Sequence, residues 1–231
     1  MYNLLQNSRY KREIAKVSIN NGFPLPQALV VENNPGDLTF QSKNSLIASV
    51  SDEGVVEGGV RGVTTILVTS MDETTIATVE VKTLINYLPE PYLGFGETYE
   101  TVKSNAASGG EIVELDDGFA IQRRIDKSDV IYLYMFENNK LKMSAFAFGT
   151  LSNIASVIVD FLLERYIPVA QTGAYSAGLI SPEMDKLILF STSDDKSTIY
   201  VGYTKYDGDK ESAVRSTKLF DEQIRKIDLN Y

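Results

Sequence analysis

The segment from Ser42 to Val81 constrains the fold more than any other part of the chain. Short runs rich in β-branched residues alternate there with glycine-containing turns. Residues 47–50 alternate apolar and small polar side chains, the period of a half-buried strand. Residues 64–69 and 75–81 predict a hairpin, because β-branched side chains suit a pleated, half-buried surface. Several short strands at this spacing predict a β-sandwich.

The order of residue types in this segment resembles the second group of bacterial Ig-like domains. Phe40 stands where that family often has Trp, and the likeness extends from about Ile14 to Lys82. It implies an all-β Ig-like sandwich. Such domains occur mostly on exported bacterial and phage surfaces, so the likeness also implies an exported protein, exposed at the cell envelope. The residues that match the family pattern are Ser42, Asn44, Ile47 to Val50, Gly54 to Val56, Gly62 and Thr64 to Ile66.

The composition excludes several kinds of chemistry. The chain has no Cys, which removes disulfides, Cys-ligated zinc and thiol nucleophiles. It has no His, the usual general base near neutral pH and the commonest metal ligand. Its formal net charge of -9 argues against nucleic acid, because neutralising phosphates needs clustered Lys and Arg. We therefore expect no cofactor, no metal site and no nucleic-acid partner.

The beginning of the chain leaves two interpretations open. Residues 1–13 lack the apolar stretch of a signal peptide, and no run of about 20 apolar residues could span a membrane. Either the protein is cytosolic, or this is the mature part of an exported protein whose leader, with a lipid-bearing Cys, has been removed. The Ig-like resemblance favours the second interpretation. Membrane attachment is then expected only through that removed lipid anchor.

Two prolines predict a domain boundary. Pro89 and Pro91 favour extended conformations in the residues before them, which makes a semi-rigid connector. After this point the residue pattern changes from short β-rich segments alone to helices alternating with strands. The predicted organisation is a flexible leader (1–13), an Ig-like β-sandwich (14–86), a Pro-rich linker (87–92), a second domain (93–206) and a charged C-terminal tail (207–231).

The second domain is predicted to contain a helix followed by about three strands, twice. A short helix follows a Thr98 cap, and a wide apolar stripe predicts the longest helix over 151–166, ended by Pro168. We therefore expect an α+β domain in which helices pack on one face of an antiparallel sheet, built from tandem α-β-β-β units. The predicted strands are 119–125, 130–137 and 140–148 in the first half, and 169–180, 186–191 and 198–205 in the second.

Five aromatic side chains are the candidate ligand-binding residues. Strand alternation places Tyr132, Tyr134 and Phe136 on one face, and the paired return strand adds Phe146 and Phe148. If water reaches this face, it is an interaction site, since exposed apolar patches tend to bind partners. If helices, the Ig-like domain, the tail or another subunit cover it, the residues are core. Periodicity does not distinguish between these two alternatives, because both faces of the strand are apolar.

The sequence shows no catalytic pattern. Ser152, Ser156 and Ser176 lack a His partner and do not begin an S-x-x-K sequence. Asp207, Asp209 and Glu211 begin like a calcium loop without the later ligands. We therefore expect a non-catalytic bacterial cell-surface binding or adhesion protein, in which the Ig-like module presents a recognition domain to an extracellular protein or glycan. Two alternatives stay open: a structural phage or envelope component, and a hydrolase that uses carboxylates alone.

Overall fold

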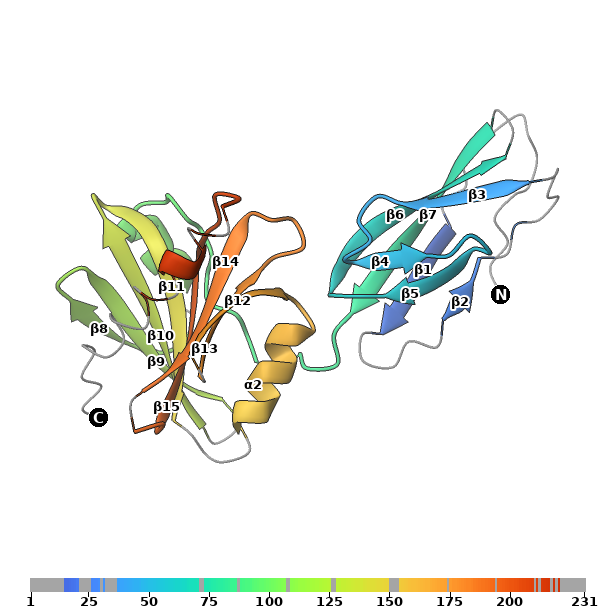
Figure 1. The fold of residues 1–231 in the computed structure, drawn as a ribbon. Coiled ribbons are helices and arrows are strands. Elements are labelled where there is room, and N and C mark those ends of the chain that lie inside the picture. The colour runs from blue at the N-terminus through green and yellow to red at the C-terminus, as the bar shows by residue number, and fades with distance from the viewer. Residues whose placement is uncertain are drawn as a thin grey trace. The chain divides into compact units, whose positions relative to one another are not determined.

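The chain forms two compact units (Figure 1). The first comprises Met1–Asn86 and Phe161–Arg165, and the second comprises Tyr87–Asp160 and Tyr166–Tyr231. The predicted leader, 1–13, and the end of the tail, 221–231, lie outside the described residues. Within the described part of the chain, no helix is both long enough and apolar enough to cross a membrane. The computed structural model describes residues 15–20, 26–29, 31, 37–70, 73–86, 88–106, 109–125, 128–149, 154–173, 175–193, 195–209, 211, 213–216, 218 and 220.

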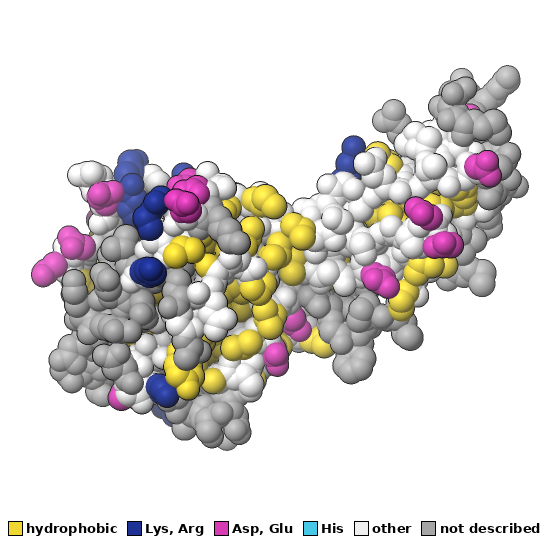
Figure 2. Space-filling view, in the orientation of Figure 1, with side chains coloured by type: hydrophobic (Ala, Val, Ile, Leu, Met, Phe, Trp, Pro, Cys, Tyr) yellow, Lys and Arg dark blue, Asp and Glu magenta, His cyan; other side chains and the backbone are white. Residues whose placement is uncertain are grey.

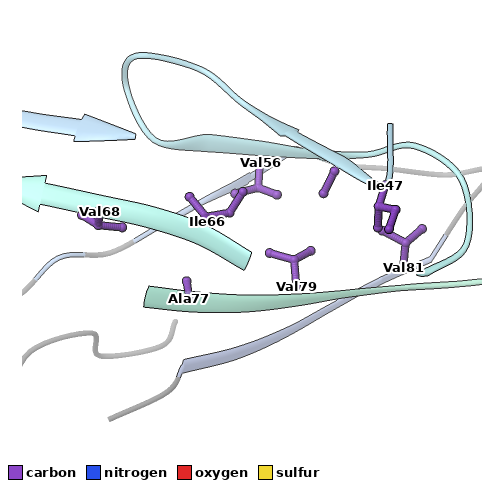
Figure 3. Close-up of a cluster of buried hydrophobic side chains, with 8 residues drawn as sticks. Ile47, Val56, Ile66, Val68, Ala77, Val79 and Val81 are labelled. Carbon is purple, nitrogen blue, oxygen red and sulfur yellow. The ribbon is translucent and has the colours of Figure 1, made fainter. Parts of the chain in front are cut away.

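The first unit consists of two sheets that share one apolar core. A four-stranded sheet has the order β1-β7-β6-β3, with β1 parallel to β7, and a three-stranded sheet has the order β2-β5-β4. Ile47 and Val56 face Ile66, Val79 and Val81 across this core (Figure 3). The strands are β1 (Ala15–Asn20), β2 (Gln27–Ala28), β3 (Leu38–Ser42), β4 (Ala48–Val50), β5 (Val55–Gly58), β6 (Gly62–Ser70) and β7 (Glu73–Lys82).

Three residues that match the Ig-like pattern, Ser42, Asn44 and Gly54, lie in or beside turns of this unit. The Asn44 Oδ1 accepts the amide proton of Leu46 (3.1 Å), and the Ser42 hydroxyl accepts that of Asn44 (3.2 Å). Gly54 has a φ of 78°, and a Cβ at this position would lie 2.7 Å from the Phe40 Cζ. Glycine is therefore required there both by the backbone and by the aromatic ring.

The second unit is one eight-stranded antiparallel sheet of order β12-β13-β14-β15-β11-β10-β9-β8 (Figure 1). Two four-stranded meanders meet at their last strands, β11 and β15. A helix precedes each meander. The elements are α1 (Tyr99–Ala106), β8 (Glu111–Leu115), β9 (Gly118–Ile125), β10 (Ser128–Glu137), β11 (Lys140–Gly149), α2 (Ile154–Leu163), β12 (Ile167–Gly173), β13 (Ser176–Ile180), β14 (Lys186–Thr192) and β15 (Thr198–Lys205).

The predicted fold class is wrong: the chain is mostly β, and its helices do not form a layer over the second sheet. α1 has only eight residues, and the end of α2, from Phe161, belongs to the first unit. Each meander also has four strands where three were predicted, because β8 was missed and the β12–β13 hairpin was taken for one stretch. The prediction assumed that helices must cover an apolar sheet face, but other segments do so here.

The predicted charged tail supplies part of that cover. Ala213 and Phe220 are buried in an apolar cluster with Leu189 and Tyr200, on the sheet face opposite the five candidate aromatic residues. A Cβ at Gly202 would lie 2.7 Å from the Phe220 ring. Both side chains lie in the segment predicted as a charged tail, and both are core.

Candidate functional site

The five predicted binding residues lie together, but four of them are core. Tyr132 pairs with Phe146 across β10 and β11, so their side chains share a face of the sheet. Tyr132, Tyr134, Phe146 and Phe148 are each at most 3% exposed, and Phe136 is half-buried. Of the two alternatives that the sequence left open, exposure to water is therefore wrong for these four residues. Sequence periodicity missed this because the cover comes from a distant segment.

Over Tyr132 and Tyr134, the cover includes the Pro-rich connector, whose residues Leu88–Tyr92 we call the strap. The Tyr132 hydroxyl donates to the Pro89 carbonyl (3.1 Å). The Tyr92 amide donates to the Tyr134 hydroxyl oxygen (3.2 Å), and the Ser144 hydroxyl donates to the Tyr92 carbonyl (2.7 Å). The polar ends of the aromatic face thus bind the backbone of the strap. Buried hydroxyls need such partners, because an unsatisfied polar group costs free energy.

Burial also changes the acidity of the two tyrosines. Desolvation raises the pKa of Tyr132 to about 12, an effect that the nearby Arg123 guanidinium partly offsets. Desolvation likewise raises the pKa of Tyr134, and the hydrogen bond from the Tyr92 amide opposes that rise. Both phenols therefore stay neutral across the physiological range, and Tyr132 keeps the proton that it donates to the strap.

A second feature of this unit is open to solvent. An apolar hollow of about 360 Å³ lies at the β12–β13 hairpin, on an edge of the sheet. Tyr175 at its rim is 51% exposed, and the Lys196 ammonium lies 4.3 Å from the centre of that ring. In Figure 2, apolar side chains gather over the part of the second unit that carries β12 to β14 in Figure 1. The residues lining the hollow include Pro168, Val169, Ala170, Tyr175, Ala177 and Phe190.

Sequence reasoning missed this hollow. Residues 169–180 were taken as one extended stretch, so the turn between Gly173 and Ser176 went unrecognised. A Gly-containing break around an aromatic residue was the available signal. Phe190 reaches the hollow from β14, which no local pattern indicates.

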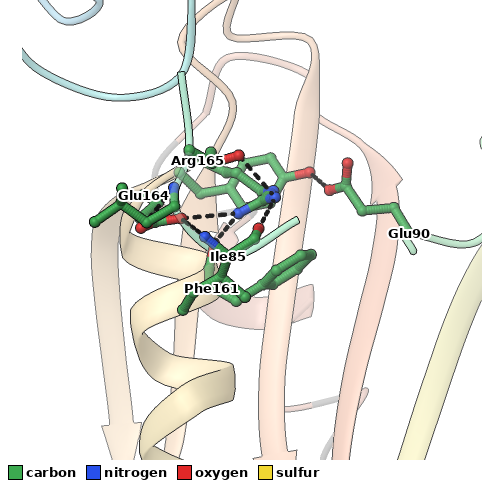
Figure 4. Close-up of polar contacts among 8 residues, drawn as sticks. Ile85, Glu90, Phe161, Glu164 and Arg165 are labelled. Atoms are coloured by element: carbon green, nitrogen blue, oxygen red, sulfur yellow. Dashed lines mark hydrogen bonds and ion pairs between the residues drawn. The ribbon is translucent and has the colours of Figure 1, made fainter. Parts of the chain in front are cut away.

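Two consecutive buried charges form a polar cluster in the first unit (Figure 4). The Glu164 carboxylate accepts the amide protons of Leu84 (3.2 Å) and Ile85 (3.1 Å). The Arg165 guanidinium donates to the Ile85 carbonyl (2.5 Å) and to the Thr83 hydroxyl (3.3 Å). Glu164 is 9% exposed and Arg165 is 6% exposed. This pair, which we call the Glu164–Arg165 clamp, binds the backbone that follows β7.

Among the described residues, the carboxyl groups with a shifted pKa belong to surface ion pairs and turns. Hydrogen bonding from Lys103 (2.5 Å) lowers the pKa of Glu114. The Ser193 hydroxyl lowers the pKa of Asp195 to about 2. Every carboxyl group in the described part of the chain with a resolved pKa shift has a lowered value. A carboxylic acid that donates a proton near neutral pH needs the opposite shift.

The acidic residues that begin like a calcium loop lie at the start of a helical turn. The Asp207 carboxylate accepts the amide proton of Asp209 (3.1 Å), and the Asp209 carboxylate accepts that of Glu211 (3.0 Å). Asp209 also pairs with Arg215 at 3.3 Å. These contacts satisfy amide protons at the start of a helical turn.

Comparison with known proteins gives few matches. No family model matches the chain, and no curated protein matches it. Among solved structures, it is similar to the crystal structure of a lipoprotein from Bacteroides thetaiotaomicron, with 11% sequence identity and a TM-score of 0.19. That match covers 84% of this chain and 97% of the lipoprotein chain. A TM-score this low does not place the chain in a fold family.

Proposed function

We propose that this chain is a non-catalytic binding protein of the bacterial cell envelope, and that its ligand binds in the β12–β13 hollow. The observation that carries the proposal is the hollow itself, an open apolar depression of about 360 Å³ beside the half-exposed Tyr175. Ligand sites are typically concave and largely apolar, with a few polar groups at hand. The ligand is an extracellular protein or glycan that offers an apolar surface to the Tyr175 ring.

The first unit is proposed to be an Ig-like module that mounts the binding unit. Two packed sheets around one core suit that architecture. The pattern residues Ser42, Asn44 and Gly54 each have a turn-forming role that a family signature would preserve. The placement at the envelope follows from this resemblance.

The absence of catalysis is part of the same proposal. It is supported by the lowered carboxyl pKa values, because a carboxylate-only hydrolase needs one acid with a raised pKa. It is also supported by the lack of His and Cys in the sequence.

A glycan array and an array of extracellular proteins, both probed with the full chain, test the binding role. We expect Tyr175→Ala to weaken binding of any captured ligand at least tenfold, since exposed aromatic anchors dominate such sites. Leu115→Ala is the matched control, because Leu115 is 44% exposed on β8, the opposite edge of the sheet. Equal losses for the two variants, or full binding by Tyr175→Ala, would remove the hollow as the site.

A further inference from the structure

The strap has the chemistry of a peptide ligand. Proline fixes its own φ near -65°, and each proline confines the residue before it to extended conformations. Leu88 and Glu90, which precede the two prolines, are therefore biased to the polyproline II or β region. Such a segment loses little conformational entropy on binding, which is why proline-rich peptides are common ligands of aromatic grooves.

Buried and exposed residues alternate along the strap. Leu88 and Pro91 are buried, whereas Pro89 between them is exposed. A spacing of three residues between buried positions is the period of a polyproline II helix. Leu88 and Pro91 thus pack inward, while Pro89 between them is turned to water.

The sheet contacts the strap as a receptor contacts a peptide backbone. Tyr132 donates to the Pro89 carbonyl, while Tyr134 and Ser144 bind the amide and the carbonyl of Tyr92. Tyr166 adds a hydrogen bond to the Glu90 carboxylate (Figure 4). The backbone contacts do not depend on side-chain identity, so another segment of the same conformation can make them.

We propose that this aromatic face is a binding groove for an extended, proline-containing peptide of a partner protein, and that the strap fills it in cis. The groove consists of Tyr132, Tyr134, Ser144 and Tyr166. A tethered segment competes with a free peptide at an effective concentration on the order of millimolar, so the strap acts as an internal inhibitor. This inference is independent of the β12–β13 hollow.

The test uses the full chain and a fluorescent peptide with the sequence of residues 87–94. In Pro89→Gly/Pro91→Gly, the strap is more flexible and should compete less well, so peptide affinity should rise about tenfold over the wild type. Adding Tyr134→Phe to that variant should lower the affinity again, because the acceptor for the Tyr92 amide is lost. Tyr206→Phe, outside the groove, is the matched control and should leave the affinity unchanged. A peptide with both prolines replaced by glycine should bind at least tenfold more weakly.

Hydrogen exchange in the wild-type chain tests whether the peptide displaces the strap, even if the double variant does not fold. Saturating peptide should accelerate exchange of the Tyr92 amide, which loses Tyr134 when the strap leaves. The Leu141 amide, bonded to the Glu97 carbonyl, should stay protected. No binding at saturating concentrations, or binding that leaves the Tyr92 amide protected, would overturn the proposal.

Discussion

The Glu164–Arg165 clamp offers the sharpest test of what stabilises the first unit. Glu164→Ala removes the acceptor of the Leu84 and Ile85 amides, and it leaves the buried Arg165 guanidinium without its carboxylate. Arg165 retains its bonds to the carbonyls of Phe161 and Ile85. The change thus removes the partner of the Arg165 charge and the acceptor of two amide protons at once.

The size of the effect follows from burial. Removing one partner of a buried ion pair costs about 3–5 kcal/mol, because the remaining charge is uncompensated. The hydrogen bonds from the Leu84 and Ile85 amides to the carboxylate are only partly buried, so water can replace the carboxylate as their acceptor. We therefore expect a loss near the lower end, about 3 kcal/mol in the free energy of unfolding. Glu164→Gln keeps one acceptor oxygen and should lose about half as much, since a neutral hydrogen bond is weaker than a charged one.

Urea unfolding followed by circular dichroism measures the total loss, and amide hydrogen exchange locates it. Exchange at Leu84 and Ile85 should accelerate in Glu164→Ala before distant strands are affected. Glu183→Ala is the matched control, because Glu183 is exposed and such substitutions usually cost less than about 0.5 kcal/mol. If Glu164→Ala costs no more than this control, the clamp does not stabilise the unit and the reasoning fails.

Three further predictions concern other parts of the molecule. Gly54→Ala should cost about 2 kcal/mol, because alanine disfavours the left-handed backbone and its Cβ would meet the Phe40 ring; an unchanged melting temperature would contradict this. Phe220→Ala should cost about 3–5 kcal/mol in chemical denaturation, as for other buried phenylalanines, and a loss below 1 kcal/mol (about the cost of a typical substitution) would mean that the tail does not contribute to the core. The raised pKa of Tyr132 favours its neutral form in the folded state, so its contribution to stability is complete below pH 10 and is lost as pH rises from 10 to about 12. Tyrosinate absorbance during alkaline titration should show one fewer late-ionising phenol in Tyr132→Phe, and an identical titration would refute the assignment.

The sequence predicted elements better than it predicted their packing. The run 64–69 and the run 75–81 lie within β6 and β7, because alternating β-branched residues allow few other conformations. The second-domain strands between 118 and 149 were also anticipated, since the Asn138-Asn139 turn marks their hairpin locally. Local patterns determine such elements because the interactions that form them are themselves local.

Only the tertiary structure decided which segments cover the sheet. Both faces of β10 are apolar in sequence, so periodicity could not show that the strap would lie on Tyr132 or that Phe220 would pack on the opposite face. The hollow at Tyr175 likewise depends on Phe190 from another strand. The sequence by itself determined the β-rich segments of the first unit, and its lack of Cys and His removed thiol and imidazole chemistry. Long-range packing decided the fold class and the site, because burial depends on partners far away in the chain.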